Sequence, residues 1–204
     1  MYISFNKKIV LYILVCLMSF MTIPVYGQIQ GGPWNTLFGE TTSQTQSKLK
    51  KINPQIKLDV LAGQQILILS DVYVAGEVFS GGCYGYQDNK LVICIFQKLI
   101  SYDDGFTHHL SYYDAENWLR SNKFKVTAAM NSIKKILSSK YGNPFKETDM
   151  EIRWRDAEGN SIGIIVDKVV NLAEKDQEMT RQFGCLPAYS ISLTYAKAPE
   201  IPNY

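Results

Sequence analysis

Residues 82–96 read GCYGYQDNKLVICIF and predict a β-hairpin. The polar pair at 88–89 favours a tight turn between two strands, and the residues that follow it are mainly aliphatic and β-branched, as in a strand. With a two-residue turn, Cys83 faces Cys94 across the hairpin on one face of the sheet. Tyr84 and Tyr86 then share the opposite face, because successive side chains of a strand alternate.

Cys83 and Cys94 are therefore the disulfide candidates. Directly opposed residues of antiparallel strands lie about 4.5–5.5 Å apart at Cα, a distance that a disulfide can span. A change of register by one residue would put the two cysteines on opposite faces and exclude the bridge. Two alternatives stay open, a bridge from one of them to Cys185 and three unpaired thiols.

The first 27 residues have the pattern of a secretory signal peptide. Lys7 and Lys8 precede an apolar run over residues 9–21, and small or slim residues near Gly27 suit a cleavage site. A retained membrane anchor is the alternative, but the apolar run is shorter than the roughly 20 residues that a spanning helix needs. We expect cleavage after Gly27, a periplasmic or secreted location in a bacterium, and no transmembrane anchor in the mature protein.

The composition is that of a globular protein, with 204 residues of which 46% are hydrophobic and 20% charged. The chain has 21 basic and 19 acidic residues, and its net charge of +2 equals the contribution of Lys7 and Lys8. The mature chain is formally neutral. Binding to nucleic acid needs clustered positive charge, so we expect no nucleic-acid partner.

The first predicted unit, residues 28–123, consists of a helix, three strands and a connecting segment. Thr41 and Gln44 fit a capping box, which opens a short helix that stops near Asn53. Strands are expected at 66–69 and 72–74, followed by the hairpin. In the connecting segment, residues 114–123 suit a further short helix.

The second predicted unit, residues 124–198, repeats this order. Its helix shows apolar residues on one face and ends at Gly142; these residues are Val126, Met130, Ile133, Leu137 and Tyr141. Apolar and polar residues then alternate over 150–154, 162–166 and 191–195, as in half-buried strands. Residues 199–204 are expected to form a flexible tail. The predicted fold class is α+β, with two successive helix-β-β-β units and antiparallel sheets.

The segment Phe38-Gly39-Glu40-Thr41-Thr42 before the first helix resembles the Gly-x-Thr start of tandem helix-plus-antiparallel-sheet modules. In element order the chain resembles SmpA-type outer-membrane assembly lipoproteins, β-lactamase inhibitor proteins and many secreted bacterial proteins of unknown function. The resemblance implies a binding or assembly role. The chain departs from the lipoprotein pattern at Cys16, which no small residue precedes.

Metal and cofactor sites are not predicted. His108 and His109 are adjacent, and adjacent side chains of an extended segment point apart, so the two do not easily share one metal ion. Asp103 and Asp104 with one histidine leave a weak surface cation site as the alternative.

No catalytic residue is assigned either. Carboxylates near Glu151 and Asp167 leave a hydrolase as an alternative, but alternation with Arg153 and Arg155 favours a solvated sheet face. Cys185 as a thiol nucleophile is a further alternative, and its flanking residues match no signature of that chemistry.

The predicted contact surface is formed by Tyr84 and Tyr86, as an exposed aromatic platform for a partner or a sugar. Tyrosines at the border of the core are the alternative. We therefore expect an exported, non-catalytic protein-binding or assembly module of the bacterial envelope, with a protein partner and no cofactor. A purely structural envelope component is another reading.

Overall fold

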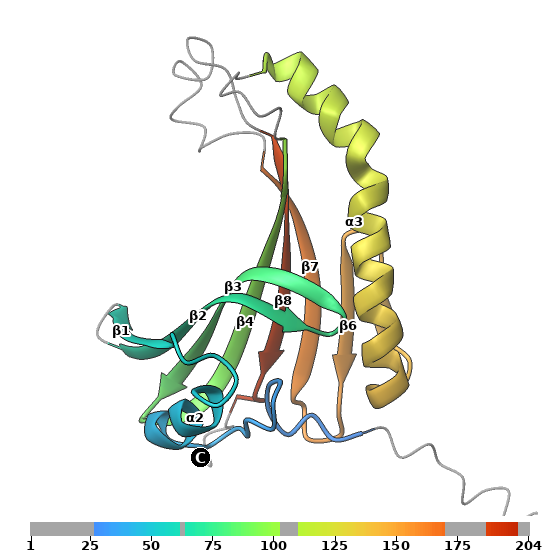
Figure 1. Cartoon of the computed structure of the whole chain (residues 1–204). Coiled ribbons are helices and arrows are strands. Elements are labelled where there is room, and N and C mark those ends of the chain that lie inside the picture. Colours follow the sequence, from blue (N-terminus) through green and yellow to red (C-terminus); the bar gives the residue numbers. More distant parts are fainter. Residues whose placement is uncertain (1–26, 62–63, 103–109, 170–186, 200–204) are drawn as a thin grey trace, which may run out of the picture.

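The computed structural model describes residues 27–61, 64–102, 110–169 and 187–199 (Figure 1). The expected signal peptide up to residue 26, both histidines, Cys185 and most of the expected tail lie outside these ranges. No described helix has both the length and the apolar character needed to span a membrane.

The described elements are two helices, each followed by four antiparallel strands. In chain order they are α2 (Thr42–Leu49), β1 (Lys57–Leu61), β2 (Gln64–Val74), β3 (Glu77–Gln87), β4 (Lys90–Ser101), α3 (Tyr112–Tyr141), β5 (Lys146–Glu147), β6 (Glu151–Arg155), β7 (Ser161–Val169) and β8 (Ala188–Ala196). The strands form one sheet in the order β1-β2-β3-β4-β8-β7-β6-β5.

The prediction of two helix-β-β-β units with separate sheets is wrong. β4 pairs with β8 from Ile93 opposite Ala196 to Ser101 opposite Ala188, and this pairing joins the two strand sets. Strand accounts for 43% of the structure and helix for 26%, so the fold is mostly sheet and only loosely α+β. If β4 and β8 were edge strands of two separate sheets, each would leave a row of backbone donors and acceptors without partners. The pairing of β4 with β8 satisfies these groups.

α3 is one continuous helix, whereas the sequence pattern predicted a separate short helix over residues 114–123. Ser111 caps its start, since its side chain accepts a hydrogen bond from the Asp114 backbone N–H at 3.2 Å. No glycine or proline interrupts the 30 residues, and the helix ends before Gly142, which has a φ of 80°. The expected boundary between residues 123 and 124 therefore falls inside α3.

The core lies between α3 and one face of the sheet. The apolar helix face predicted from Val126, Met130, Ile133, Leu137 and Tyr141 is buried, as expected. Two aromatic side chains of this layer donate hydrogen bonds to backbone carbonyls. The Trp154 Nε1–H of β6 donates to the Gly142 carbonyl at 2.9 Å, and the Tyr189 hydroxyl of β8 donates to the Leu119 carbonyl at 2.8 Å.

The β2–β3 hairpin bends over toward α3 (Figure 1). Along β2 the buried positions change from Leu67 and Leu69 to Val72 and Val74, on either side of Asp71 with its φ of 49°. At the hairpin tip, a Cβ added to Gly76 would lie 2.6 Å from Ile136 Cδ1 of α3. The hairpin tip therefore packs closely against the helix.

A hydrogen-bonded turn holds the beginning and the end of the described chain. Asp156, in the turn between β6 and β7, accepts the Ile29 N–H at 2.9 Å and the Asn160 N–H at 2.9 Å. The Asn160 side-chain oxygen accepts the Ala198 N–H at 2.9 Å. Ile29 is 1% exposed, so the segment that follows the expected cleavage position is part of the core.

Candidate functional site

The β3–β4 hairpin forms where it was predicted, but its register differs. Asp88 and Asn89 make the two-residue turn, with φ values of 51° and 56°. Gln87 opposes Lys90, but the register shifts between Gly85 and Tyr86, so that Gly85 opposes Ile93. One extra residue on β4, Val92, is thus left without a partner on β3, as in a β-bulge.

This bulge moves the two cysteines apart. Cys83 opposes Ile95, and Cys94 opposes Tyr84, so that the two thiols lie on opposite faces of the sheet. Both cysteines are free in the structure. The disulfide predicted between Cys83 and Cys94 is therefore wrong, and the one-residue change of register is the reason.

The prediction that Tyr84 and Tyr86 form an exposed platform is also wrong. Tyr84 is 0% exposed and Tyr86 is 4% exposed, because both point into the core together with Cys94. The Tyr84 ring meets the Phe96 ring edge to face, with centroids 5.9 Å apart. Burial raises the pKa of Tyr86 to about 12 and raises the pKa of Cys94 well above its ordinary value. Tyr84 and Tyr86 therefore do not form an exposed contact surface.

The carboxylates considered for a hydrolase lie on the sheet and line neither of the two pockets described below. Glu151 forms ion pairs with Lys146 and Arg153. The hydrogen bond from Lys146 is the main cause that lowers the pKa of Glu151. A general acid needs a raised pKa, so this shift is in the opposite direction. Asp167 lies on the neighbouring strand β7 and is exposed.

Among the described residues, no group of three or more histidine, cysteine, aspartate or glutamate side chains is arranged to hold a metal ion.

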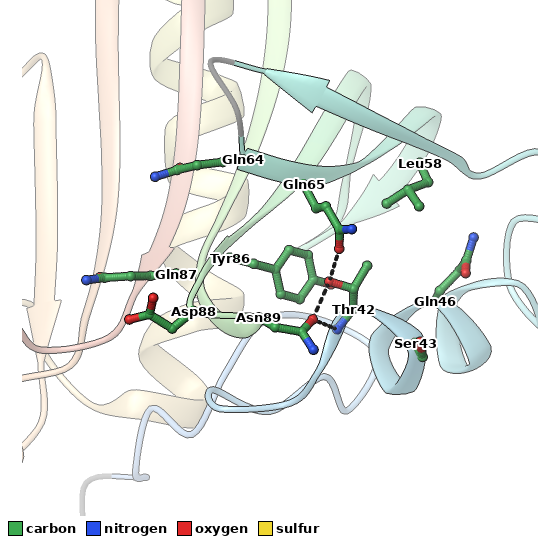
Figure 2. Close-up of a pocket in the computed structure, with 10 residues that line it drawn as sticks. All are labelled: Thr42, Ser43, Gln46, Leu58, Gln64, Gln65, Tyr86, Gln87, Asp88 and Asn89. Carbon is green, nitrogen blue, oxygen red and sulfur yellow. Dashed lines mark hydrogen bonds between the residues drawn. The ribbon is translucent and has the colours of Figure 1, made fainter.

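A polar pocket of about 790 Å³ lies where α2 meets the β1–β2 and β3–β4 hairpins (Figure 2). We call it the amide pocket, because side-chain amides dominate its lining. Its residues are Thr42, Ser43, Gln46, Leu58, Gln64, Gln65, Tyr86, Gln87, Asp88 and Asn89.

Local sequence features position the α2 side of the amide pocket. The capping box predicted from Thr41 and Gln44 is present, since the Thr41 N–H donates to Gln44 Oε1 at 2.9 Å and Thr41 Oγ1 accepts the Gln44 N–H at 3.3 Å. The helix therefore starts at Thr42. This start places Thr42 against the turn residue Asn89 and leaves Ser43 and Gln46 at the other end of the pocket (Figure 2).

Thr42 organises the centre of the amide pocket. Its backbone N–H donates to Asn89 Oδ1 at 3.2 Å, and its hydroxyl lies 3.0 Å from the same oxygen and 3.2 Å from Gln65 Oε1 (Figure 2). A hydroxyl has one hydrogen to donate and can also accept. The Thr42 hydroxyl therefore donates its one hydrogen to either Asn89 Oδ1 or Gln65 Oε1, both of which are acceptors. The side-chain N–H groups of Asn89 and Gln65 then remain available to the pocket.

Other amides of the pocket have no fixed partner. Within the described ranges, the side chains of Gln46, Gln64 and Gln87 make no hydrogen bond to the protein. Each offers one acceptor and two donor hydrogens. The pocket contains one carboxylate, Asp88, so two-carboxylate acid–base chemistry is not available there. The arrangement suits binding of an uncharged polar molecule.

A second pocket of about 480 Å³ adjoins the amide pocket and shares Gln87 and Asp88 with it. We call it the strand-end pocket, because the ends of β4 and β8 form it. Its other lining residues are Lys90, Val92, Ile93, Ala196, Lys197, Ala198 and Pro199.

Of the residues that line the two pockets, the sequence pointed to Tyr86 alone as a site residue, and there as part of an exposed platform and not of a pocket. The turn at 88–89 and the capping box were recognised as structural signals only. Gln46, Gln64 and Gln87 belong to three different elements, and no spacing pattern connects them. The pairing of β2 with β3 and the position of α2 bring them together.

Comparison of the chain with protein-family models, with curated proteins and with solved structures gives no match. The resemblance to outer-membrane assembly lipoproteins and β-lactamase inhibitor proteins therefore stays a prediction.

Proposed function

We propose that this protein is an exported, non-catalytic binding protein of the bacterial envelope, and that its amide pocket takes an uncharged polar ligand. The proposal keeps the binding role expected from the sequence and changes the site. Export rests on the signal-peptide pattern of the first 27 residues.

The observation that carries the proposal is the set of unpaired amides around one pocket. Gln46, Gln64 and Gln87 present donors and acceptors that no described residue uses, while Gln65 and Asn89 are held in place by Thr42. Fixed polar groups on a pocket wall lose little freedom when a ligand binds, and they give orientation and specificity. The volume of about 790 Å³ lies within the roughly 300–1,000 Å³ typical of small-molecule sites.

The lack of a second carboxylate favours binding over turnover at this pocket. Asp88 alone cannot supply both a general acid and a general base or nucleophile, which hydrolysis of a glycosidic bond requires. A ligand bound by the amides would therefore dissociate without chemical change.

The test is NMR titration of the isotope-labelled mature protein with small uncharged probes, namely methyl glucoside, N-acetylglucosamine, sorbitol and N-methylacetamide. We expect at least one probe to shift the backbone amides of residues 42–46, 64–65 and 86–89. Gln46→Leu should weaken the effect, because leucine keeps the helix and removes a donor and an acceptor. Gln97→Leu is the matched control, since Gln97 is exposed on β4 and lines neither pocket. Absence of shifts in the pocket for all four probes, or equal shifts in both variants, would overturn the proposal.

A further inference from the structure

We infer that the ligand is an uncharged oligosaccharide whose chain runs from the amide pocket across the β3–β4 turn into the strand-end pocket. The inference rests on the proposed function and adds the chemical class and the extent of the ligand. Three observations carry it, namely the residues that the two pockets share, the mixture of polar and apolar side chains in their lining, and the charge of the amide pocket.

The two pockets meet at Gln87 and Asp88, which line both of them. In Figure 2 these two side chains lie at the opposite end of the amide pocket from Ser43 and Gln46. Gln87 and Asp88 thus lie at the end of the amide pocket that borders the strand-end pocket. Pockets of about 790 and 480 Å³ in series suit a chain-like ligand with units in each.

The lining chemistry matches a sugar chain. Sugar hydroxyls donate and accept at the same time, and side-chain amides do the same through separate N–H and C=O groups. The C–H face of a sugar ring needs apolar contacts. Leu58, which is 49% exposed, supplies such a contact in the amide pocket, and Val92, Ile93 and Pro199 supply them in the strand-end pocket.

Charge argues against a polyanionic chain. The amide pocket contains a carboxylate, Asp88, and its other polar groups are uncharged. An acidic sugar next to Asp88 would place two negative charges together without a cation in that pocket, which is unfavourable. Lys90 and Lys197 lie in the strand-end pocket, where they can donate hydrogen bonds to hydroxyls.

The test is calorimetry of the mature protein with three uncharged series, the β-1,4-glucan, α-1,4-glucan and chitin oligosaccharides, from two to six units. We expect one series to gain at least about tenfold in affinity, which is about 1.4 kcal/mol, between the shortest and the longest member. A hexamer of galacturonic acid serves as the acidic comparison and should bind more weakly. Ala196→Gln should fill the strand-end pocket and remove the gain with length, while disaccharide binding stays unchanged. Lys90→Ala is the second variant in case the first does not fold, and Gln97→Leu is the control.

Each result of the calorimetry supports or overturns the inference. Equal affinity for two and six units would overturn the spanning claim, and tighter binding of the acidic hexamer would overturn the claim of an uncharged chain. If the small probes shift the amide pocket but no oligosaccharide binds, the inference fails and the proposed function stands. If neither the probes nor the oligosaccharides bind, both fail.

Discussion

Replacement of Asp156 by alanine should destabilise the whole fold. Its carboxylate accepts four hydrogen bonds, from the backbone N–H groups of Ile29, Glu158 and Asn160 at 2.9, 3.0 and 2.9 Å and from the Asn160 side chain at 3.1 Å. Hydrogen bonds to charged groups contribute about 1.5–3 kcal/mol, and a buried donor left without a partner costs about 1–3 kcal/mol. In the variant, the N–H groups of the turn can partly form hydrogen bonds to water instead. We therefore expect Asp156→Ala to lower the free energy of unfolding by about 2–4 kcal/mol.

The assay is urea unfolding followed by tryptophan fluorescence. With a slope of about 2 kcal/mol per M, in the middle of the usual range, the predicted loss lowers the urea midpoint by about 1–2 M. Asp156→Asn keeps one carbonyl oxygen for the turn and loses the acceptor for Ile29, so it should lose about half as much. Glu158→Gln is the control, because Glu158 is exposed in the same turn, and its effect should stay within about 0.5 kcal/mol. A midpoint for Asp156→Ala equal to that of the control would refute the role of this turn in holding the chain ends.

Three further results are expected. Peptide mapping of the non-reduced protein should find no bridge between Cys83 and Cys94, and a linked peptide would contradict the bulged register. Burial raises the pKa of Cys94 and of Tyr84 above their ordinary values of 9.0 and 10.0. The contribution of these neutral groups to the free energy of unfolding is therefore fully present below the ordinary pKa values. It should fall by about 1.4 kcal/mol per pH unit for each group as the pH rises above those values, and a urea midpoint that is constant from pH 8 to pH 11 would refute this. Gly76→Ala should cost about 2–3 kcal/mol, because its φ of 83° disfavours a side chain and the new Cβ would lie 2.6 Å from α3. Gly39→Ala, with a φ of 87° and nothing within 4 Å of the added Cβ, should cost only about 1–2 kcal/mol, and equal losses would contradict the contact with α3.

Local structure was largely predictable from the sequence. The capping box at Thr41 and the end of α3 at Gly142 formed as expected. The alternating strands β6, β7 and β8 were also recognised correctly from their period of two. These features depend on residues close together in the chain, whose backbone preferences act over a few positions.

Long-range pairing was not predictable in the same way. The contact between β4 and β8 joins residues about a hundred positions apart, and hydrophobic alternation in each strand fits many partners. The bulge at Val92 adds a single residue to β4. The run of aliphatic residues in this strand contains no signal for that extra residue. That one residue made the predicted disulfide wrong. The predicted tyrosine surface was wrong because the face of β3 that carries Tyr84 and Tyr86 packs into the core.

The candidate site was missed for a related reason. Amide side chains are common on surfaces, and Gln46, Gln64 and Gln87 carry no local signal of binding. Only the folded arrangement of α2 and the two hairpins shows that they line one pocket.

The most direct measurement is the crystal structure of the mature protein with an uncharged hexasaccharide from the series that binds best. We expect sugar rings in both the amide pocket and the strand-end pocket, with the chain crossing beside Gln87 and Asp88 and hydrogen bonds to Gln65 and Asn89. Sugar bound on another face of the sheet or along α3, or confined to one pocket, would contradict this expectation.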